Sequence, residues 1–269
     1  MSTSSLASPP ADPWGPGALP RSVTRSGLRL MRASTFLLQT RARLRRRYAL
    51  PGLELPDDLS TRAAELQQTS RRLCELLGVS VEIRGLRPTG PCWLVANHLG
   101  YLDPLAIGGM TPCVAIAKRE LAGWPLLGEA LTRLGGLFVT RGNAHDGAVV
   151  LRRALGSIAR GVSVLTFPEG TTSIGDDVLP LRRGIFGLAR RTGLPVVPIA
   201  VHHRPRESAW IDDQLFLPHY LRTIARPRTR VVLGIGEPLL PDAAPSPAAL
   251  ADLTRARLRV LLHELAGSP

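Results

Sequence analysis

The sequence predicts an α/β fold with a largely parallel central sheet that is flanked by helices and preceded by an N-terminal amphipathic helical hairpin. From residue 80 onward, short runs rich in Val and Ile alternate with helical patterns, as in sheets whose parallel strands are joined by helices. Before that point, leucines recur at helical spacing in two segments. The chain has 269 residues and is 44% hydrophobic, which is enough for one large domain with its own core or for two small domains.

The first 78 residues divide into two parts. Residues 1–25 are rich in Ser, Pro and Gly, and we expect a disordered tail there. Residues 26–78 are expected to be a helical, membrane-associating segment that precedes the main domain at 79–269. The first helix has apolar residues at near-heptad spacing, which predict one apolar stripe: Leu30, Met31, Leu37, Leu38, Leu44 and Tyr48.

Arginines crowd the same helix: Arg29, Arg32, Arg41, Arg43, Arg45, Arg46 and Arg47. A basic amphipathic helix commonly lies on an anionic membrane surface. The alternative is a helix that packs on the core and turns a basic face to solvent. A second helix is predicted after "LPDDLS", with Leu59, Leu66, Leu73 and Leu77 on its apolar face and Gly78 at its end.

Residues 79–269 contain the predicted sheet. Its helices are expected at 145–160, 184–192 and 247–265, and no internal repeat is visible. One strand contains Pro198, which lacks a backbone donor and therefore requires a bulge or a sheet edge. The predicted strands are "VSVEI", "CWLVAN", "CVAIA", "GLFVT", "SVLTF", "VVPIAV" and "RVVLGIG".

The charge of the chain restricts its partners. A net charge of +13 favours a polyanion, which can be nucleic acid, an anionic membrane or a phosphorylated substrate. Aromatic residues make up only 4%, and no zinc-finger or RNA-recognition signature is present, so we expect no nucleic acid. Three scattered cysteines indicate a reducing compartment without disulfides or a metal site. No apolar run reaches about 18 residues and no signal peptide is expected.

Polar residues gather where predicted strands end. In "VANHLGYLDPLAI", His98 and Asp103 follow a strand. Asp103 precedes Pro104, so it could simply cap a helix, with His98 as a polar loop residue. Two further strand ends are "GGLFVTR", which ends in Arg141, and "SVLTFPEGTTS". Because chemistry in α/β sheets tends to lie at the carboxyl ends of strands, these segments are candidates for a shared site.

In this order and at these spacings, four blocks resemble the lysophospholipid acyltransferases of the 1-acylglycerol-3-phosphate acyltransferase type. The blocks are "NHLGYLD", "GGLFVTR", "FPEGTTS" and "VVPIAV", and the link "AKRELAGWPLLG" is also similar to the family. The resemblance covers about residues 80–240. Many members carry arginine where this chain has Thr172, and threonine occurs there in a subset that includes some enzymes of ornithine-lipid and lysophosphatidylcholine acylation. The acceptor therefore stays open.

The resemblance implies an O-acyltransferase of the EC 2.3.1 class that serves phospholipid biosynthesis. His98 would be the general base and Asp103 would orient it and stabilise its imidazolium. The donor would be acyl-CoA or acyl-carrier protein, with no acyl-enzyme, cofactor or metal ion. Glu169 would orient Arg141 or a substrate hydroxyl. The implied substrate-binding residues are Asn97, Lys118, Phe138, Arg141, Glu169, Gly170, Thr171, Thr172, Ser173 and Pro198.

The expected product is phosphatidic acid from 1-acylglycerol-3-phosphate, formed by a peripheral or monotopic enzyme on the cytoplasmic side of the cell membrane. The stretch "WPLLGEALTRLGGLF" is either a second shallow membrane contact or ordinary core. Three alternatives remain: acylation of another lysolipid, such as lyso-ornithine lipid or lysophosphatidylcholine; transacylation from a phospholipid; and a non-catalytic basic membrane-binding module. An α/β-hydrolase is disfavoured because the chain has no Gly-x-Ser-x-Gly elbow.

Overall fold

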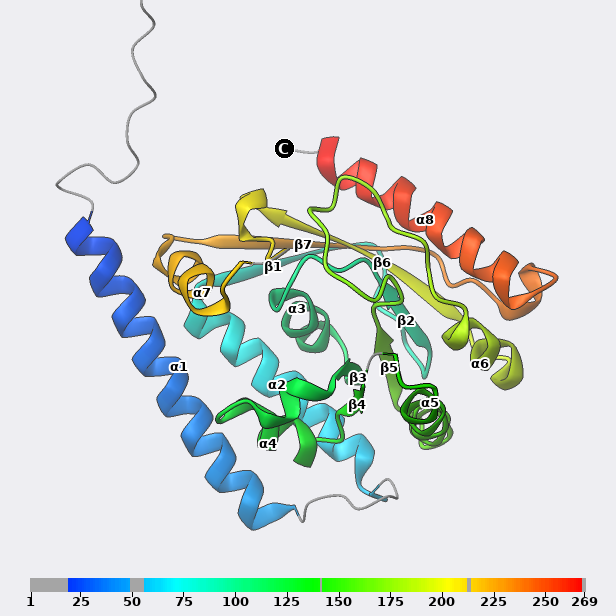
Figure 1. Cartoon of the computed structure of the whole chain (residues 1–269), viewed down its shortest axis with the longest axis horizontal. Coiled ribbons are helices and arrows are strands. Elements are labelled where there is room, and N and C mark those ends of the chain that lie inside the picture. The colour runs from blue at the N-terminus through cyan, green and yellow to red at the C-terminus, as the bar shows by residue number, and fades with distance from the viewer. Residues whose placement is uncertain (1–18, 49–55, 141, 212–213, 268–269) are drawn as a thin grey trace, which may run out of the picture.

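The computed structural model describes residues 19–48, 56–140, 142–211 and 214–267. In these ranges a seven-stranded sheet has the order β1-β7-β6-β2-β5-β3-β4 (Figure 1). The five adjacent strands from β6 to β4 are parallel, β7 is antiparallel to β6, and β1 is parallel to β7, which confirms the largely parallel sheet. The strands are β1 (Val79–Arg84), β2 (Trp93–Ala96), β3 (Cys113–Lys118), β4 (Leu137–Val139), β5 (Ser163–Thr166), β6 (Val196–Arg204) and β7 (Thr229–Ile235).

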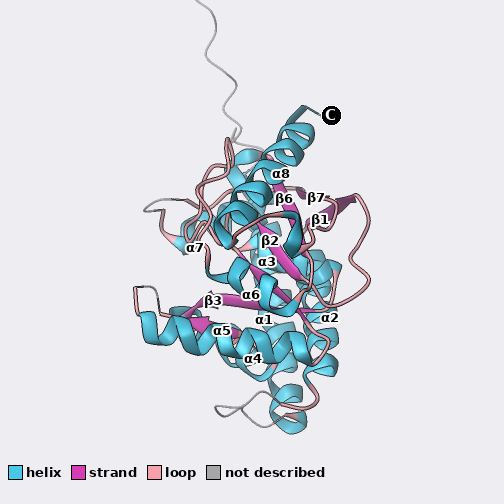
Figure 2. Cartoon of the chain, turned by 90° about the vertical axis from the view of Figure 1, so that its right-hand side faces the viewer, coloured by secondary structure: helices cyan, strands magenta, loops and turns pink. Residues whose placement is uncertain are grey.

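Helices cover both faces of the sheet. In β2, Trp93 and Val95 point into a core shared with α5 (Ala144–Ala159), α6 (Gly184–Thr192) and α8 (Pro247–Gly267). Leu94 and Ala96 point into the opposite core, shared with α2 (Leu59–Leu77), α3 (Leu102–Met110) and α7 (Phe216–Ala225). Figures 1 and 2 show the sheet between these two layers. Because both faces are buried, the strands read as nearly continuous apolar runs, which is why all seven were predictable.

Pro198 occupies an interior strand, so a sheet edge, one of the two explanations considered above, does not apply. β6 lies between β2 and β7. The antiparallel ladder to β7 starts only at Ile199, and the carbonyl of Pro198 accepts the N–H of Gly236 at 2.9 Å. The missing proline donor is tolerated because the residue stands just before that ladder begins.

The first helix, α1 (Leu19–Arg47), begins earlier than expected and lies along the outer side of α2 and α7 (Figure 1). The predicted tail at 1–25 therefore ends too late, although residues 1–18 lie outside the described residues. Tertiary contacts hold the early turns, since Arg25 donates to the carbonyl of Ala225 and Arg29 donates to the carbonyls of Ile224 and Arg226 at the end of α7.

The inner side of α1 packs on the domain. Ala33, Leu44 and Tyr48 are buried. The arginines of its second half form ion pairs: Arg41 and Arg45 bind Glu129 of α4 (Leu127–Arg133), and Arg43 and Arg47 bind Glu65 of α2. The core-packing alternative is therefore correct for this side of the helix.

The outer side of α1 exposes apolar residues: Val23, Leu28, Leu30, Met31 and Leu38. The prediction of one apolar stripe is wrong, because Leu38 faces solvent while Leu44 is buried. Six residues turn an α-helix by about 240°, so these two leucines lie on different sides. No helix among the described ranges is long and apolar enough to cross a bilayer.

Candidate active site

The candidate site lies at the carboxyl ends of the neighbouring strands β2 and β5. The loop after β2 carries His98, and the loop after β5 carries Glu169. The two loops are joined by main-chain contacts: the N–H of Ser173 donates to the carbonyl of His98 at 2.9 Å, and the N–H of His98 donates to Glu169 Oε2 at 2.9 Å. Two of the sequence blocks are thereby brought together.

His98 is held in place by Asp103 and Phe167. Its Nδ1 lies 2.7 Å from Asp103 Oδ2, and its ring stacks on Phe167 with 4.2 Å between ring centroids. The side chain is 19% exposed. Because Nδ1–H donates to the carboxylate, the neutral ring carries its lone pair on Nε2, and Nε2 has no hydrogen-bond partner among the described residues. This arrangement suits a general base.

Asp103 is fully buried and accepts four hydrogen bonds. Its Oδ2 accepts from His98 and from the N–H groups of Leu99 and Gly100 at 2.6 and 2.8 Å, and its Oδ1 accepts from His203 Nε2 at 2.8 Å. Burial alone would raise the pKa of this carboxyl, but the hydrogen bonds from His203 and His98 outweigh burial and hold the pKa well below its usual range. The carboxylate is therefore ionised at neutral pH.

Asp103 is not the N-cap that its sequence position suggested. Helix α3 begins at Leu102 and its N-cap is Tyr101, which makes no side-chain cap. The carboxylate instead faces back to the loop at Leu99 and Gly100. It therefore fixes the loop that carries His98 as well as the imidazole itself.

Glu169 supports the site through the main chain, a role that the sequence did not predict. Oε2 accepts the N–H of His98 and Oε1 accepts the N–H of Leu179, both at 2.9 Å. The side chain is buried, and burial raises the pKa of its carboxyl although these two bonds act in the opposite direction. Arg141 lies outside the described residues.

The turn after Glu169 carries Gly170 at a φ of +74°, which favours glycine. A Cβ at this position would lie 2.6 Å from Cζ of Arg182, so the Arg182 guanidinium rests against the turn. Thr171 is exposed and Thr172 is half-buried. The main-chain N–H of Arg182 donates to the carbonyl of Pro168 at 2.9 Å, while its guanidinium makes no hydrogen bond or ion pair with the described part of the chain. Sequence reasoning missed it, although the basic pair in "PLRRG" shortly after the "FPEGTTS" block was an available signal.

Two predicted substrate-binding residues belong to the scaffold instead. Asn97 is fully buried, and its side-chain amide exchanges two hydrogen bonds with the main chain of Val201 in β6, at 2.7 and 3.1 Å. Pro198 is buried within the same strand. Both residues set the position of β6 beside β2, and neither offers a surface to a substrate.

Lys118 and Phe138 lie on the same edge of the sheet but farther away. Lys118 is exposed at the end of β3 and Phe138 is half-buried in β4, which are two and three strands from β2. At about 4.8 Å per strand, these positions are roughly 10 and 14 Å from β2 across the sheet. They can meet a long substrate, but not the atoms next to His98.

His203 is the other residue that sequence reasoning missed. It lies near the end of β6 and is 1% exposed, with Nε2 on Asp103 Oδ1. The signal was the pair His202–His203 directly after "VVPIAV". In a strand, adjacent side chains point to opposite faces, so only one of the two could reach the neighbouring loop.

Comparisons with known proteins show the family of this chain. The sequence model of the acyltransferase family, described as Acyltransferase, matches residues 79–202. The lyso-ornithine lipid O-acyltransferase of Pseudomonas aeruginosa is 30% identical over 196 residues, which cover 71% of this chain and 75% of that protein. This chain belongs to the acyltransferase family. A 1-acyl-sn-glycerol-3-phosphate acyltransferase alpha from Mus musculus is 32% identical over 197 residues, 71% of this chain and 66% of that protein.

A solved structure shares the fold of this acyltransferase. The crystal structure of the 1-acyl-sn-glycerophosphate acyltransferase from Thermotoga maritima superposes with a TM-score of 0.68 at 22% identity, covering 94% of this chain and 99% of that chain. The match includes the sheet and the N-terminal helix. The chain is therefore an O-acyltransferase, and the non-catalytic module is set aside as an explanation of its charge.

Proposed function

We propose that this acyltransferase moves a fatty acyl chain from a thioester to the free hydroxyl of a lysophospholipid, with 1-acylglycerol-3-phosphate as acceptor and phosphatidic acid as product. The observation that carries the proposal is the pairing of His98 with Asp103 at 2.7 Å, which leaves Nε2 of His98 for the acceptor hydroxyl. Relatives whose names describe acyl transfer to 1-acyl-sn-glycerol-3-phosphate and to lyso-ornithine lipid support this class of acceptor.

In the proposed reaction, His98 Nε2 removes the hydroxyl proton as the acceptor oxygen attacks the thioester carbonyl. A C–O ester bond forms, the C–S bond breaks, and the leaving thiolate takes the proton from the imidazolium. Asp103 stabilises that imidazolium and fixes its tautomer. This reaction needs no acyl-enzyme, cofactor or metal ion. Acyl-CoA or acyl-carrier protein can serve as the acyl donor.

The acceptor phosphate is assigned to Arg182. A guanidinium binds phosphate through a planar fork of donors. This guanidinium rests on the Gly170 turn, and the adjacent Ser173 bonds the main chain of His98. Thr172 carries no charge. The phosphate is therefore assigned to Arg182, whose cationic side chain lies against this turn. The position favours an acceptor with a phosphate close to its free hydroxyl.

We further propose that the enzyme works as a peripheral protein on the cytoplasmic surface of the membrane. The support is the outer side of α1, where Met31 is 59% exposed and Leu38 is 52% exposed. Exposed apolar residues on one helix face, in a chain of net charge +13, suit an anionic interface. The stretch "WPLLGEALTRLGGLF" contributes less, because Leu134 and Leu137 are core residues.

One assay tests the function and separates the alternatives. Purified protein is given one acyl-CoA with 1-acylglycerol-3-phosphate, lyso-ornithine lipid or lysophosphatidylcholine, while thiol release and product mass are measured. Acyl-carrier protein thioester and a diacyl phospholipid replace acyl-CoA in parallel reactions. The proposal expects fastest thiol release with 1-acylglycerol-3-phosphate, and at least a 100-fold loss in His98→Ala. Product without thiol release identifies a transacylase, and preference for lyso-ornithine lipid replaces the proposed acceptor.

A further inference from the structure

Asp103 is shared by two histidines from distant parts of the chain. Its Oδ2 faces the loop, where it accepts from His98, Leu99 and Gly100. Its Oδ1 accepts from His203 Nε2, and in the part of the chain that the structure describes no other donor reaches Oδ1. Both oxygens of the Asp103 carboxylate are thus held, Oδ2 by the loop that carries His98 and Oδ1 by strand β6.

The free nitrogen of His203 indicates its protonation state. Nδ1 is buried and has no hydrogen-bond partner among the described residues. An imidazolium would place an N–H on this nitrogen, and a buried unpaired donor on a charged ring is costly. The neutral tautomer with its proton on Nε2 leaves only an unpaired lone pair there. It also provides the donor that an ionised Asp103 needs.

Neutrality matters for the chemistry. A charged His203 would neutralise Asp103 and weaken its attraction for the imidazolium that forms on His98 during acyl transfer. A neutral donor instead stabilises the carboxylate and leaves its negative charge in place. It also fixes the plane of the carboxylate, so that Oδ2 stays directed at His98 Nδ1.

The fold fixes the position of the His203 side chain. The side chain is 1% exposed, and β6 is fixed beside β2 by the two hydrogen bonds between Asn97 and Val201. His202, the preceding residue, is also buried but makes no hydrogen bond to Asp103. The strand therefore contains a matched control for the substitution of His203.

We propose that His203 is a positioning residue for acyl transfer: as a neutral imidazole it donates Nε2–H to Asp103 Oδ1, and it thereby keeps the carboxylate ionised and aimed at His98. The proposal deepens the function proposed above. His203 acts only through Asp103 and touches neither acyl donor nor acceptor.

The kinetic test compares His203→Gln, His203→Leu and His202→Leu. A glutamine amide can donate one hydrogen bond but cannot titrate, whereas leucine fills the space without a donor. We expect His203→Leu to lower kcat by about tenfold to 100-fold with the acceptor KM changed less than about twofold, since the Asp–His pair loses its alignment. His203→Gln should keep at least about a third of kcat, and His202→Leu should match wild type.

The pH profile separates positioning from a purely structural role. The titratable groups around His203 are His98, Asp103, His202 and His219 of α7. In His203→Leu, the carboxylate loses a donor, so the pair with His98 binds a proton more readily. The acidic limb of kcat/KM should move upward by about one pH unit, the usual scale of one hydrogen bond to a charged group. It should stay in place in His203→Gln.

A spectroscopic measurement makes the inference independent of the assay. In protein labelled with ¹⁵N-histidine, the His203 signals are assigned by their loss in His203→Gln. At the pH of maximal activity, or at pH 7.5 if acyl transfer is not observed, we expect protonated Nε2 and unprotonated Nδ1. Protonation of both nitrogens overturns the proposal, as does equal damage in the Gln and Leu variants at matched melting temperatures. Absence of acyl transfer in wild type rejects the proposed function but leaves this measurement intact.

Discussion

Glu169 Oε2 accepts the main-chain N–H of His98 at 2.9 Å, while its other oxygen accepts the N–H of Leu179, also at 2.9 Å. The carboxylate thus joins the loop that carries His98 to the loop that carries Leu179. A residue that the sequence placed among the binding groups also fixes the main chain at His98.

We expect Glu169→Gln to lower kcat by about tenfold to 100-fold with little change in the acceptor KM. A glutamine has one acceptor atom, so its NH₂ group must face one of the two N–H donors, and the loop with His98 shifts. Small misplacements of catalytic groups have effects of this size. Steady-state kinetics with 1-acylglycerol-3-phosphate measures both constants. Glu82→Gln in β1, at the far edge of the sheet, is the control. A raised KM with unchanged kcat would instead place Glu169 on the substrate.

We expect Asp103→Asn to lower kcat at least 100-fold, because an amide cannot accept all four hydrogen bonds and can present a donor to His98 Nδ1. The fold lowers the pKa of Asp103, so the stability that it contributes is present above its ordinary pKa near 4 and is lost as pH falls through the folded value. The difference in free energy of unfolding between wild type and Asp103→Asn should therefore shrink below about pH 4. Urea unfolding between pH 2.5 and 7 measures it, and a constant difference would contradict the depressed pKa.

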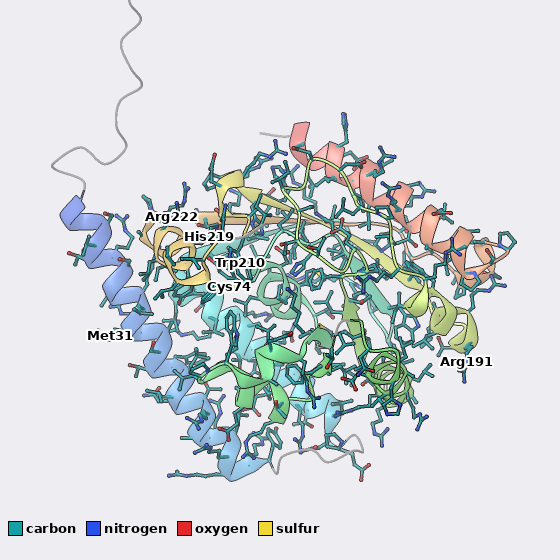
Figure 3. All side chains as sticks on the ribbon, viewed as in Figure 1. Met31, Cys74, Arg191, Trp210, His219 and Arg222 are labelled. Carbon is teal, nitrogen blue, oxygen red and sulfur yellow. The ribbon has the colours of Figure 1, made fainter. Side chains whose placement is uncertain are left out.

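We expect Arg182→Gln to raise the KM for 1-acylglycerol-3-phosphate about tenfold, with a smaller effect on kcat, because a charge-assisted contact with the phosphate is lost. Arg182→Lys should recover part of the loss, since lysine keeps the charge without the fork. Arg191→Gln is the charge-matched control, because Arg191 lies at the far end of α6 in Figure 3. An equal rise in KM for Arg182→Gln and Arg191→Gln would mean that Arg182 contributes only to the overall charge of the protein.

We expect the double variant Met31→Glu with Leu38→Glu to lose binding to anionic vesicles while its melting temperature stays within a few degrees of wild type. Both side chains are exposed, and Figure 3 shows Met31 on the side of α1 that faces away from the sheet. Carboxylates there remove apolar burial and add repulsion from anionic lipid. Val260→Glu changes an exposed apolar residue of α8 and is the control. Sedimentation with vesicles across a salt series gives the result, and unchanged sedimentation would move the contact to another surface.

We expect deletion of residues 1–50 to destabilise the protein rather than to release an intact domain from the membrane. Leu44 and Tyr48 are buried, and the arginines of the same helix end bind Glu65 and Glu129. Their removal uncovers apolar parts of α2 and α4 and leaves two carboxylates without their main partners. Calorimetry and light scattering of the truncated protein test this expectation. A cooperative transition at the wild-type temperature would show that the helix is dispensable for folding.

Much of the fold was readable from local patterns. A strand buried on both faces is a short apolar run rich in Val and Ile, and α2 ends at Gly78, which takes the left-handed conformation. The second half of α1 has the arginines that the sequence showed, although the prediction that its apolar residues form one stripe was wrong. Helix α7 was not predicted, because Pro218 interrupts its short apolar pattern in the first turn.

The resemblance of "NHLGYLD" to the family's block predicted His98 and Asp103 as a pair, and the structure places Nδ1 of His98 2.7 Å from Oδ2 of Asp103. The amino-acid sequence could not assign Asn97 to the scaffold, direct Glu169 to the main chain or bring Arg182 onto Gly170. His203 is 100 residues from Asp103 along the chain. These relationships depend on the register of β6 against β2 and on how the loops cross at one sheet edge. Hydrogen bonds between such distant residues form only after the strands have paired, so no periodicity or spacing within one segment encodes them.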